Sequence, residues 1–513
     1  MSLVSAEFLI FVLISAGGYY LIPKKGQWIW LLAFSYLYYL SSGVGVVFFL
    51  LSGTLTTYVA GCSLEMLERS VGDTEIEKGT KKRKKKRVLI LTLVFNFGIL
   101  GILKYAGFFL ENINLIFHTG FSFQTVLLPL GISFYTFQSM GYLLDVYWGK
   151  CKAEKNVFRF ALFVSFFPQL LQGPIGRYDR LAEQLYRTHS FSMERIGFGA
   201  QRILWGYFKK LVLADRAGVV VNQVFQNYTD YMGITVMVAV LCYSIQLYAD
   251  FSGGIDVVLG TAELFGITLD ENFKRPFFAV SITDFWHRWH ITLGTWMKDY
   301  VFYPLSLSKG MSRFGKWSKK RFGKKTGRVL PICAANIVVF IVVGIWHGAA
   351  WKYIVYGLYN GVLIALASLF APVFRKGFEW THIDPKSFGW KIVRIIRTFL
   401  LVNISWFFDR AESVGDAFRM MGYAVTQFDP SQLLTITTGA GGTVQTITVL
   451  CILGAGCLVL FVVGLLQERG ISIRERIAAW PPAFHFAIYL GLLLAVGFLG
   501  STASVRGFIY AQF

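Results

Sequence analysis

The residues best suited to chemistry gather in two short stretches of an otherwise apolar chain. The first, FWHRWHITLGTWMKDYVFYP at 285–304, holds His287 and His290 among basic and tryptophan side chains. The second, VVGIWHGAAWKY, places His347 in an apolar run between two glycines. An ionisable side chain in such a run is costly and usually lines a functional cavity. Because a neutral imidazole can take a proton from a hydroxyl, His347 is a candidate general base.

Two further segments carry polar side chains in apolar surroundings. The stretch YADFSGG holds Asp250 and Ser252, and PQLLQGPIGRYDR holds Arg177. Asp250 can be a buried functional charge, can cap the segment that follows it, or can pair with a basic residue such as Arg288. Arg177 can bind an anionic group, and it can equally form a salt bridge or face lipid. The residues themselves leave these alternatives open.

A metal site and a serine hydrolase are both disfavoured. His287 and His290 have the i, i+3 spacing of metal ligands on a helix, and His347 is available as a third ligand. No carboxylate or cysteine motif of the zinc-protease type accompanies them, so we expect no metal, and no G-x-S-x-G motif is evident. The 6 cysteines are scattered without a CxxC pair, as buried small residues are. The other histidines stand singly and are expected to pack or to lie at an interface: His118, His189, His382 and His485.

The composition places these residues in a membrane protein. Of 513 residues, 55% are hydrophobic and only 15% are charged, and the mean hydropathy is +0.53. Apolar runs such as 88–103, 329–346 and 445–466 recur, and several approach the roughly 20 residues that a helix needs to cross a bilayer. We therefore expect an all-α, polytopic integral membrane protein with about ten to twelve transmembrane helices.

The net charge of +21 is concentrated between the apolar runs. Two basic loops stand out, one near 63–87 with the run KKRKKKR, and one at 309–328 that holds no acidic residue. By the positive-inside rule both are expected in the cytoplasm, where they set orientation and contact anionic membrane lipids. Recognition of a phosphorylated donor is the alternative, and nucleic acid is not an expected partner. The apolar runs that precede the first loop place the N-terminus outside the cytoplasm.

A single integral membrane domain over 1–513 is expected, because no polar segment is long enough to build a core of its own. The stretch 173–200 is polar and broken by Gly and Pro, which indicates helices that lie in the interface or re-enter the membrane without crossing it. The segment 128–150 carries Pro129, Gly131 and Gly141 in an apolar run, so we expect a kinked span or part of a cavity wall.

The stretch 285–304 is expected to form one interfacial helix on the cytoplasmic side, where tryptophan and tyrosine favour the membrane boundary. Such a helix turns His290 inward, leaves His287 at the edge of the inward face, and points Arg288 and Lys298 largely away. Helical spacing groups the residues of the inward face: Trp286, His290, Leu293, Met297 and Tyr300.

A set of ordered segments links the chain to a known family. They are LPLGISFYTFQSMGYLLDVYWGK at 128, FPQLLQGPIGRY at 167, YADFSGGIDVVLG at 248, FWHRWHITLGTWMKDYVFYPL at 285 and GIWHGAAWKYIVYGLYNG at 344. With these segments the whole chain resembles the bacterial branch of the membrane-bound O-acyltransferases. That branch contains the alginate O-acetylation protein and, more distantly, the D-alanyl transfer protein of teichoic acid modification. Segments in this order are far more specific than any one of them alone.

The resemblance implies a fold whose helices enclose a tunnel, with the histidine of the WHG segment essential. By motif match this histidine is His347, and the histidine of RWHI, His290, is a nearby catalytic or positioning residue. The resemblance and the surrounding sequence together name the candidates to bind substrate or line the tunnel: Arg288, Trp289, Trp346, Asp250, Ser252 and Arg177.

The chain departs from the usual pattern of this branch at several positions. His287 stands where the branch often has Arg, and Gly294 replaces a common Ser. The YNG at 359 stands where His-Gly is frequent, and Asp409 in WFFDRAES occupies the place of an aromatic residue. Since both motif histidines are present, these changes bear on substrate and partner more than on the reaction class.

The implied reaction is transfer of an acetyl group from a cytoplasmic thioester across the membrane, for O-acetylation of an extracytoplasmic polysaccharide. Acetyl-coenzyme A is the expected co-substrate, with no tightly bound cofactor. The alternatives are D-alanyl transfer from a carrier-protein thioester to a cell-wall polymer, a proton-coupled transporter in which buried His and Asp relay protons, and an inactive scaffold.

The resemblance also implies a partner and a location. No domain of this chain resembles the separate extracytoplasmic transferase that commonly completes delivery to the polymer. An SGNH-like acetyltransferase, or one like AlgX or AlgJ, is therefore the expected partner. The expected location is the cytoplasmic membrane of a bacterium, crossed several times by the chain.

Overall fold

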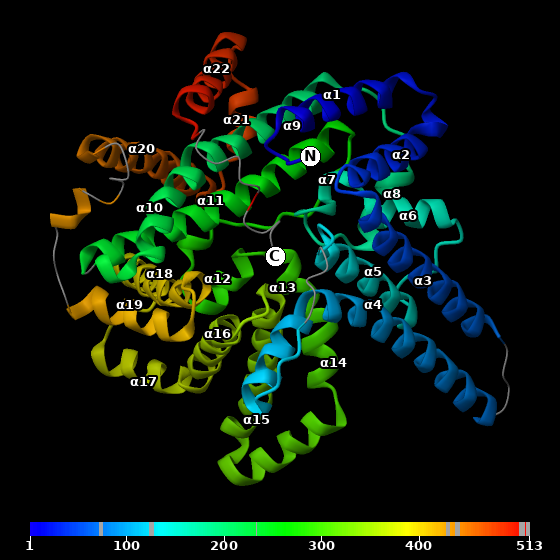
Figure 1. Ribbon diagram of the computed structural model, residues 1–513. Helices are drawn as coiled ribbons and strands as arrows, with labels where there is room; N and C mark the ends of the chain where they lie inside the picture. The colour runs from blue at the N-terminus through cyan, green and yellow to red at the C-terminus, as the bar shows by residue number, and fades with distance from the viewer. Residues whose placement is uncertain are drawn as a thin grey trace. The chain divides into compact units, whose positions relative to one another are not determined.

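The fold is given by a computed structural model, which describes residues 1–70, 75–122, 128–231, 233–426, 431–434, 436, 442–501 and 508. Over these ranges the regular elements are helices, and one isolated β-bridge pairs Phe273 with Trp289. Figure 1 shows the helices in chain order, coloured from blue to red. The predicted all-α class is confirmed.

The chain packs into two compact units. The first contains Met1–Tyr207 and Gly254–Asp270, and the second contains Phe208–Gly253 and Glu271–Ser504. The long helix α11 (Ile234–Leu264) contributes residues to both. The single integral domain expected from the sequence stays a prediction.

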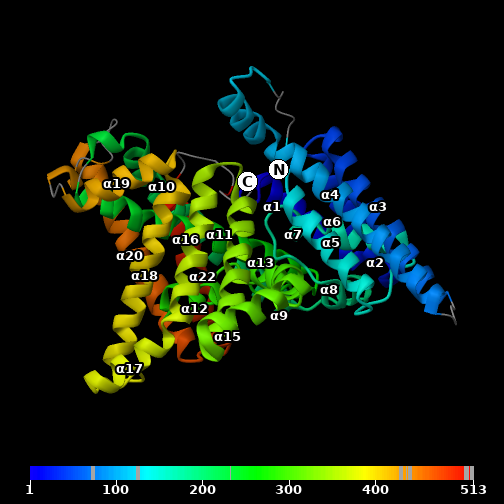
Figure 2. The same ribbon diagram turned by 90° about the horizontal axis from the view of Figure 1, so that it is seen from below.

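The first unit consists of N-terminal helices that pack on one another. Helix α3 lies against α4 and α5, and α2 lies against α6, as the blue and cyan ribbons of Figure 2 show. Its helices before α11 are α1 (Ala6–Leu21), α2 (Gln27–Leu40), α3 (Val44–Arg69), α4 (Glu75–Phe117), α5 (Ile132–Tyr147), α6 (Val157–Ser165), α7 (Phe167–Leu170), α8 (Tyr178–Tyr186) and α9 (Met193–Tyr207), with a 3-10 turn at Lys24–Gly26.

The start of α5 depends on a glycine. Gly131 has φ of 74°, a left-handed conformation, and an ideal Cβ there would lie 2.3 Å from the carbonyl oxygen of Leu170. Both the backbone conformation and the lack of space therefore require glycine. Pro129 and Gly131 precede α5 and do not interrupt it, so the kink expected at these two residues is wrong, whereas Gly141 lies within the helix. The cavity wall expected there stays a prediction.

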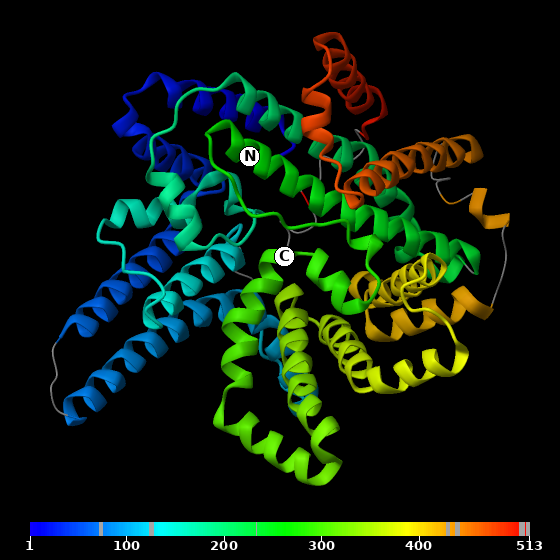
Figure 3. The same ribbon diagram turned by 180° about the vertical axis from the view of Figure 1, so that it is seen from behind.

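The second unit holds the C-terminal helices, of which α16, α18 and α19 pack together, coloured from yellow-green to orange in Figure 3. Besides α11 its α-helices are α10 (Asp215–Gln226), α12 (Ile282–Arg288), α13 (Ile291–Met297), α14 (Tyr303–Ser306), α15 (Lys309–His347), α16 (Trp351–Leu369), α17 (Ala371–Thr381), α18 (Phe388–Arg410), α19 (Val414–Thr426), α20 (Gly442–Glu468), α21 (Ile473–Ala478) and α22 (Pro482–Leu499). Phe208–Ala214 and Lys298–Phe302 are π-helical, and Tyr228–Asp230, Pro276–Phe278 and Ser431–Leu434 are 3-10 turns.

Helices α15 and α16 form a close antiparallel pair that carries His347 at its turn. Two glycines allow the contact. An ideal Cβ at Gly344 would lie 2.2 Å from the carbonyl oxygen of Tyr353, and one at Gly357 would lie 2.2 Å from that of Phe340. Gly344, three residues before His347, thus allows the backbones of the two helices to approach closely, as small residues do in membrane proteins.

Helices of membrane-spanning length occur in both units. By length and composition seven helices of the described chain can cross a membrane: α3, α4, α11, α15, α16, α20 and α22. In α22 none of the 18-residue apolar window is buried within the protein, as expected of a helix that faces lipid. The predicted count of about ten to twelve crossings thus depends on shorter or more polar helices as well, such as α1 with 16 residues.

The basic segments are helical, so their prediction as loops near 63–87 and 309–328 is corrected. Helix α3 continues to Arg69, residues 81–87 lie within α4, and 309–328 forms the first part of α15. Lysine and arginine are good helix formers, which explains the continuation. Helix α15 bends at Gly323, where φ is 79°. Residues 71–74 lie outside the described ranges.

Candidate active site

His290 lies at a break between two short helices. Helix α12 ends at Arg288, Trp289 is extended, and His290 adopts a left-handed conformation with φ of 46° before α13 begins. The single interfacial helix expected over 285–304 is therefore wrong. The expected direction of the side chain holds, because His290 is buried while His287 is exposed.

Asn272 fixes both the backbone and the ring at this break. Its carbonyl oxygen accepts from the Ile291 amide at 3.0 Å, and its Oδ1 accepts from the Thr292 amide at 3.0 Å and the Thr292 hydroxyl at 2.8 Å. The same Oδ1 lies 3.3 Å from His290 Nδ1. Because the Thr292 amide can only donate, this atom is an acceptor and His290 Nδ1 carries the proton. In the neutral ring, Nε2 then holds the lone pair.

Burial keeps this imidazole uncharged. His290 has 2% of its surface exposed, and its ring lies 4.8 Å from that of Phe251. Burial first, and the nearby His347 second, hold the pKa of His290 well below its ordinary value of 6.5. At neutral pH the ring is therefore a hydrogen-bond acceptor at Nε2 and not a cation.

His347 is the last residue of α15 and is buried among rings. The Tyr356 ring of α16 lies 5.2 Å from its ring centre, edge-on, and the Tyr353 ring is stacked at 6.3 Å. Trp346 joins the two histidines, since its indole lies 5.2 Å from His347 and 5.5 Å from His290. The structure thus brings together three residues of the predicted site.

An acidic residue lies on the Nδ1 side of His347. Asp409, in the last turn of α18, has its Oδ1 4.0 Å from His347 Nδ1, and both side chains are almost fully buried. Its Oδ2 accepts a hydrogen bond of 2.6 Å from the Tyr243 hydroxyl of α11. The sequence marked Asp409 only as a departure from a pattern. The signal that could have singled it out is a carboxylate directly after the aromatic run WFF near the end of α18.

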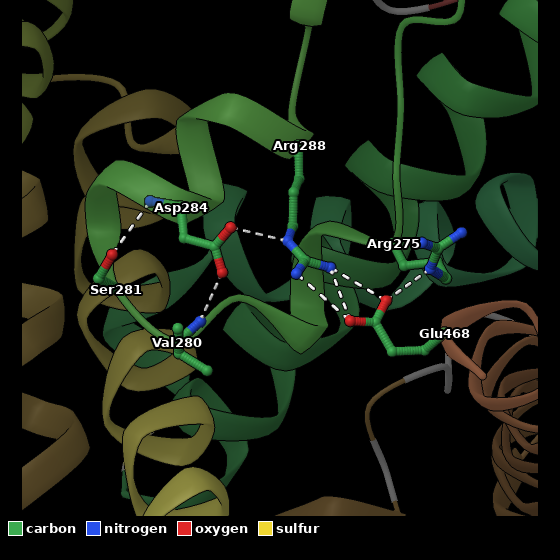
Figure 4. A network of polar contacts seen from close by, with 6 residues as sticks. All are labelled: Arg275, Val280, Ser281, Asp284, Arg288 and Glu468. Carbon is green, nitrogen blue, oxygen red and sulfur yellow. Dashed lines mark hydrogen bonds and ion pairs between the residues drawn. The ribbon is translucent and has the colours of Figure 1, made fainter. Parts of the chain in front are cut away.

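Arg288 belongs to a network of ion pairs, drawn in Figure 4. Its Nε donates to Asp284 at 2.9 Å, and both terminal nitrogens reach the carboxylate of Glu468 at 3.1 to 3.3 Å. Arg275 donates to the same carboxylate at 2.7 Å. These contacts tie the end of α20 to α12. The expected role of Arg288 in donor binding stays a prediction.

Trp289 lies in an aromatic cluster next to the break. It has 2% of its surface exposed and contacts the rings of Phe273 at 5.0 Å, Phe285 at 5.5 Å and Trp406 at 5.6 Å. Because its ring is packed on several sides, Trp289 fixes the backbone next to His290. Trp346, in contrast, touches both histidines.

Comparison with known proteins bears directly on this site. A model of the membrane-bound O-acyltransferase (MBOAT) family matches residues 152–318, which include His290 and end before His347. The probable alginate O-acetylase AlgI of Pseudomonas syringae pv. tomato is 34% identical over 430 residues, which cover 83% of this chain and 74% of that protein. This chain belongs to the membrane-bound O-acyltransferase family.

Further relatives differ in the reaction for which they are named. The peptidoglycan O-acetyltransferase of Helicobacter pylori is 34% identical over 363 residues, covering 66% of this chain and 64% of that protein. The teichoic acid D-alanyltransferase of Bacillus subtilis is 31% identical over 283 residues, covering 54% of this chain and 67% of that protein. The protein is thus an acyltransferase of the membrane-bound family, which sets aside the transporter and the inactive scaffold.

In this O-acyltransferase the predicted tunnel residues of α11 take part in buried polar contacts. Asp250 lies 2.7 Å from Lys210, and Ser252 accepts a hydrogen bond of 2.9 Å from Lys209. Lys210 also lies 2.8 Å from Asp215. Asp250 stands in the middle of α11, so the cap is wrong, and its basic partner is Lys210 and not Arg288. Burial would lower the pKa of Lys210, but the two aspartates raise it.

Arg177 lies in the first unit, at the start of α8. Its Nη1 is 3.8 Å from Asp145, a carboxylate that also lies 3.3 Å from Lys150. The salt bridge that the sequence left open is therefore present. Whether Arg177 also binds an anionic substrate group stays a prediction.

Proposed function

We propose that this O-acyltransferase transfers an acetyl group from acetyl-coenzyme A to a hydroxyl group destined for an extracytoplasmic polysaccharide. The observation that carries the proposal is the buried group of His347, Asp409 and His290 in a chain of this family. The names of the relatives support acetyl as the group, since they include alginate O-acetylases and a peptidoglycan O-acetyltransferase.

His347 would act as the general base. A thioester is already activated, so the enzyme has to align it, deprotonate the acceptor and stabilise the oxyanion. As Nε2 of His347 takes the hydroxyl proton, the acceptor oxygen attacks the thioester carbon and a C–O bond forms. The C–S bond then breaks, and the proton passes to the leaving thiolate.

His290 suits a positioning role. Asn272 sets the tautomer in which Nε2 of His290 accepts hydrogen bonds. A neutral ring of this form cannot donate from Nε2 to an oxyanion, but it can accept from an amide N–H of the donor or from the acceptor hydroxyl. Of the two roles expected from the sequence, orientation of the substrate is therefore the one that this geometry favours.

Delivery to the polymer would need a second protein. An SGNH-like transferase outside the cytoplasm, similar to AlgX or AlgJ, is the partner we propose, with membrane lipids around the spans. The enzyme would lie in the cytoplasmic membrane of a bacterium, with its N-terminus outside and its basic segments inside.

A D-alanyl thioester on a carrier protein is the second candidate donor. The observation that favours it is the similarity to the teichoic acid D-alanyltransferase of Bacillus subtilis, which covers 54% of this chain. The similarity to the alginate O-acetylase covers 83% of the chain, which favours acetyl as the transferred group.

Transfer assays with each of the two candidate donors test this proposal. The purified protein, alone and with the product of a neighbouring gene, is incubated with [14C]acetyl-coenzyme A or with a carrier protein loaded with [14C]D-alanine. Alginate oligosaccharides and peptidoglycan fragments serve as acceptors. We expect label in an acceptor or in the partner protein from acetyl-coenzyme A only. If label is transferred only from the carrier protein loaded with D-alanine, the donor is a D-alanyl thioester and not acetyl-coenzyme A.

A further inference from the structure

Asp409 and Tyr243 form a buried chain of contacts behind His347. The Tyr243 hydroxyl donates to Asp409 Oδ2 at 2.6 Å, and Asp409 Oδ1 faces His347 Nδ1 at 4.0 Å. The histidine and the aspartate have 4% and 3% of their side-chain surface exposed. Three helices thus contribute one residue each, since Tyr243 lies in α11, His347 in α15 and Asp409 in α18.

The two cations near Asp409 donate their hydrogen bonds to other groups. Lys352, at the start of α16, donates to the carbonyl oxygen of Ala411 at 2.7 Å. Arg410 donates to the side chain of Asn222 at 2.8 Å and lies over the Phe225 ring. The basic group at Asp409 Oδ1 is therefore His347. A buried carboxylate is costly unless hydrogen bonds or a positive charge compensate it.

We propose that Asp409 is the positioning residue of His347 and that Tyr243 anchors Asp409, an inference that rests on the proposed role of His347 as the base. A carboxylate at Nδ1 selects the tautomer that carries its proton there and leaves the Nε2 lone pair for the acceptor hydroxyl. It also stabilises the imidazolium that forms when Nε2 takes the proton.

The separation of 4.0 Å is longer than a hydrogen bond, and the chemistry does not require one in the resting state. Catalytic hydrogen bonds are often long without substrate and shorten in the reacting complex. Tyr243 fixes the carboxylate from the far side, so a small rotation of the imidazole would close the contact. Tyr353 and Tyr356 from α16, Trp346 of α15 and His290 before α13 also lie next to His347.

The same two helices supply a matched control. The Ser244 hydroxyl of α11 donates to Asn403 of α18 at 2.9 Å, and both residues are buried. This pair is a polar contact between α11 and α18, like Tyr243 with Asp409, but it does not contact His347. Ser244→Ala therefore measures the effect of losing a buried hydrogen bond between these helices.

The test compares steady-state acetyl transfer from acetyl-coenzyme A by wild type, Asp409→Asn, Asp409→Glu, Tyr243→Phe and Ser244→Ala. For Asp409→Asn we expect kcat to fall by about 100-fold or more, with little change in the KM for acetyl-coenzyme A. Tyr243→Phe should lose about tenfold, and Asp409→Glu should recover part of the loss. Ser244→Ala should stay within about threefold of wild type.

The pH profile separates positioning from a structural role. Without the carboxylate the imidazolium of His347 loses its negative neighbour, so the acid limb of the rate profile should move to lower pH in Asp409→Asn. An unmoved acid limb together with a kcat within threefold of wild type overturns the proposal. If Asp409→Asn does not fold, Tyr243→Phe carries the same test, and activity equal to that of Ser244→Ala contradicts the inference.

The outcome also distinguishes this inference from the proposed function. If the wild type transfers acetyl and His347→Ala does not, while Asp409→Asn keeps full activity, only the role of Asp409 is refuted. If the wild type itself transfers no acetyl group from acetyl-coenzyme A, the proposed function fails together with the inference.

Discussion

His290 contributes to the site through its backbone as well as its ring. Its φ of 46° is left-handed, a conformation that asparagine tolerates better than most residues. We expect His290→Asn to fold normally and to lose acetyl transfer by about 100-fold, because the ring at Nε2 is gone while the turn remains. Thermal unfolding in detergent and the transfer rate measure the two effects.

The matched control for this change is His382→Asn. His382 is also left-handed, with φ of 53°, but it is exposed at the end of α17. It should keep both stability and activity. Equal activity in His290→Asn and wild type would show that the ring plays no part in the reaction.

The buried His290 also makes stability depend on pH. Below about pH 6.5 the unfolded chain binds a proton at this residue, whereas the folded chain, whose pKa at His290 is well below that value, does not. Stability is therefore full above this pH and falls as the pH decreases, by about 1.4 kcal/mol per pH unit until the folded pKa is reached. Thermal unfolding of wild type between pH 7.5 and 5 should fall more steeply than that of His290→Asn. Parallel curves would contradict a neutral His290.

The burial of single residues was predictable from sequence where a short motif marks the residue. The WHG and RWH motifs gave His347 and His290, and both are buried beside Trp346. The partners were not predictable. Asp409 is far from His347 along the chain, and Asp250 pairs with Lys210 because a π-helical segment brings that lysine to α11.

At the scale of helices, the contact of α15 with α16 depends on Gly344. Because an added Cβ would lie 2.2 Å from a carbonyl oxygen, Gly344→Ala should destabilise the protein by about 1–3 kcal/mol and displace His347. Gly454→Ala in α20 is the control, since nothing lies within 4 Å of an ideal Cβ there. Thermal unfolding and transfer activity are measured for both. Equal effects of the two changes would mean that α15 and α16 do not meet at this glycine.

The ion pairs between α12 and α20 make a second prediction. If Arg288 holds Glu468 for structural reasons, Glu468→Gln and Arg288→Ala should both unfold at lower temperature than wild type. Their KM for acetyl-coenzyme A should remain within about twofold. A KM that rises strongly in Arg288→Ala and not in Glu468→Gln would instead assign the arginine to donor binding.

Helices were predicted best where a long apolar run of the sequence forms most of the helix. The sequence did not predict the break at Trp289, because the helical spacing of apolar residues continues through it. The break is stabilised by Asn272, from another segment, whose Oδ1 accepts a hydrogen bond from the Thr292 amide. The basic segments were expected as loops because they are rich in charged residues, although lysine and arginine have a high helix propensity. In α4 the basic residues and the apolar run share one helix, and in α15 the basic residues are helical on both sides of the bend at Gly323.

At the scale of the whole molecule, membrane orientation is the open prediction. The positive-inside rule places the basic residues of α4 and α15 in the cytoplasm and the N-terminus outside. A cysteine at Lys82 or Lys320, in a background without native cysteines, should resist a membrane-impermeant maleimide in intact cells and react in opened ones. A cysteine at Ser2 should react in intact cells. The reverse pattern would invert the proposed direction of transfer.

The central claim is that His347 activates an acceptor hydroxyl for acetyl transfer. Its most direct test is the initial rate of [14C]acetyl transfer from acetyl-coenzyme A by equal amounts of folded wild type and His347→Ala. We predict that the variant keeps the thermal midpoint of wild type within a few degrees and loses transfer by about 1,000-fold or more. A folded His347→Ala protein that transfers acetyl at the wild-type rate would contradict the account.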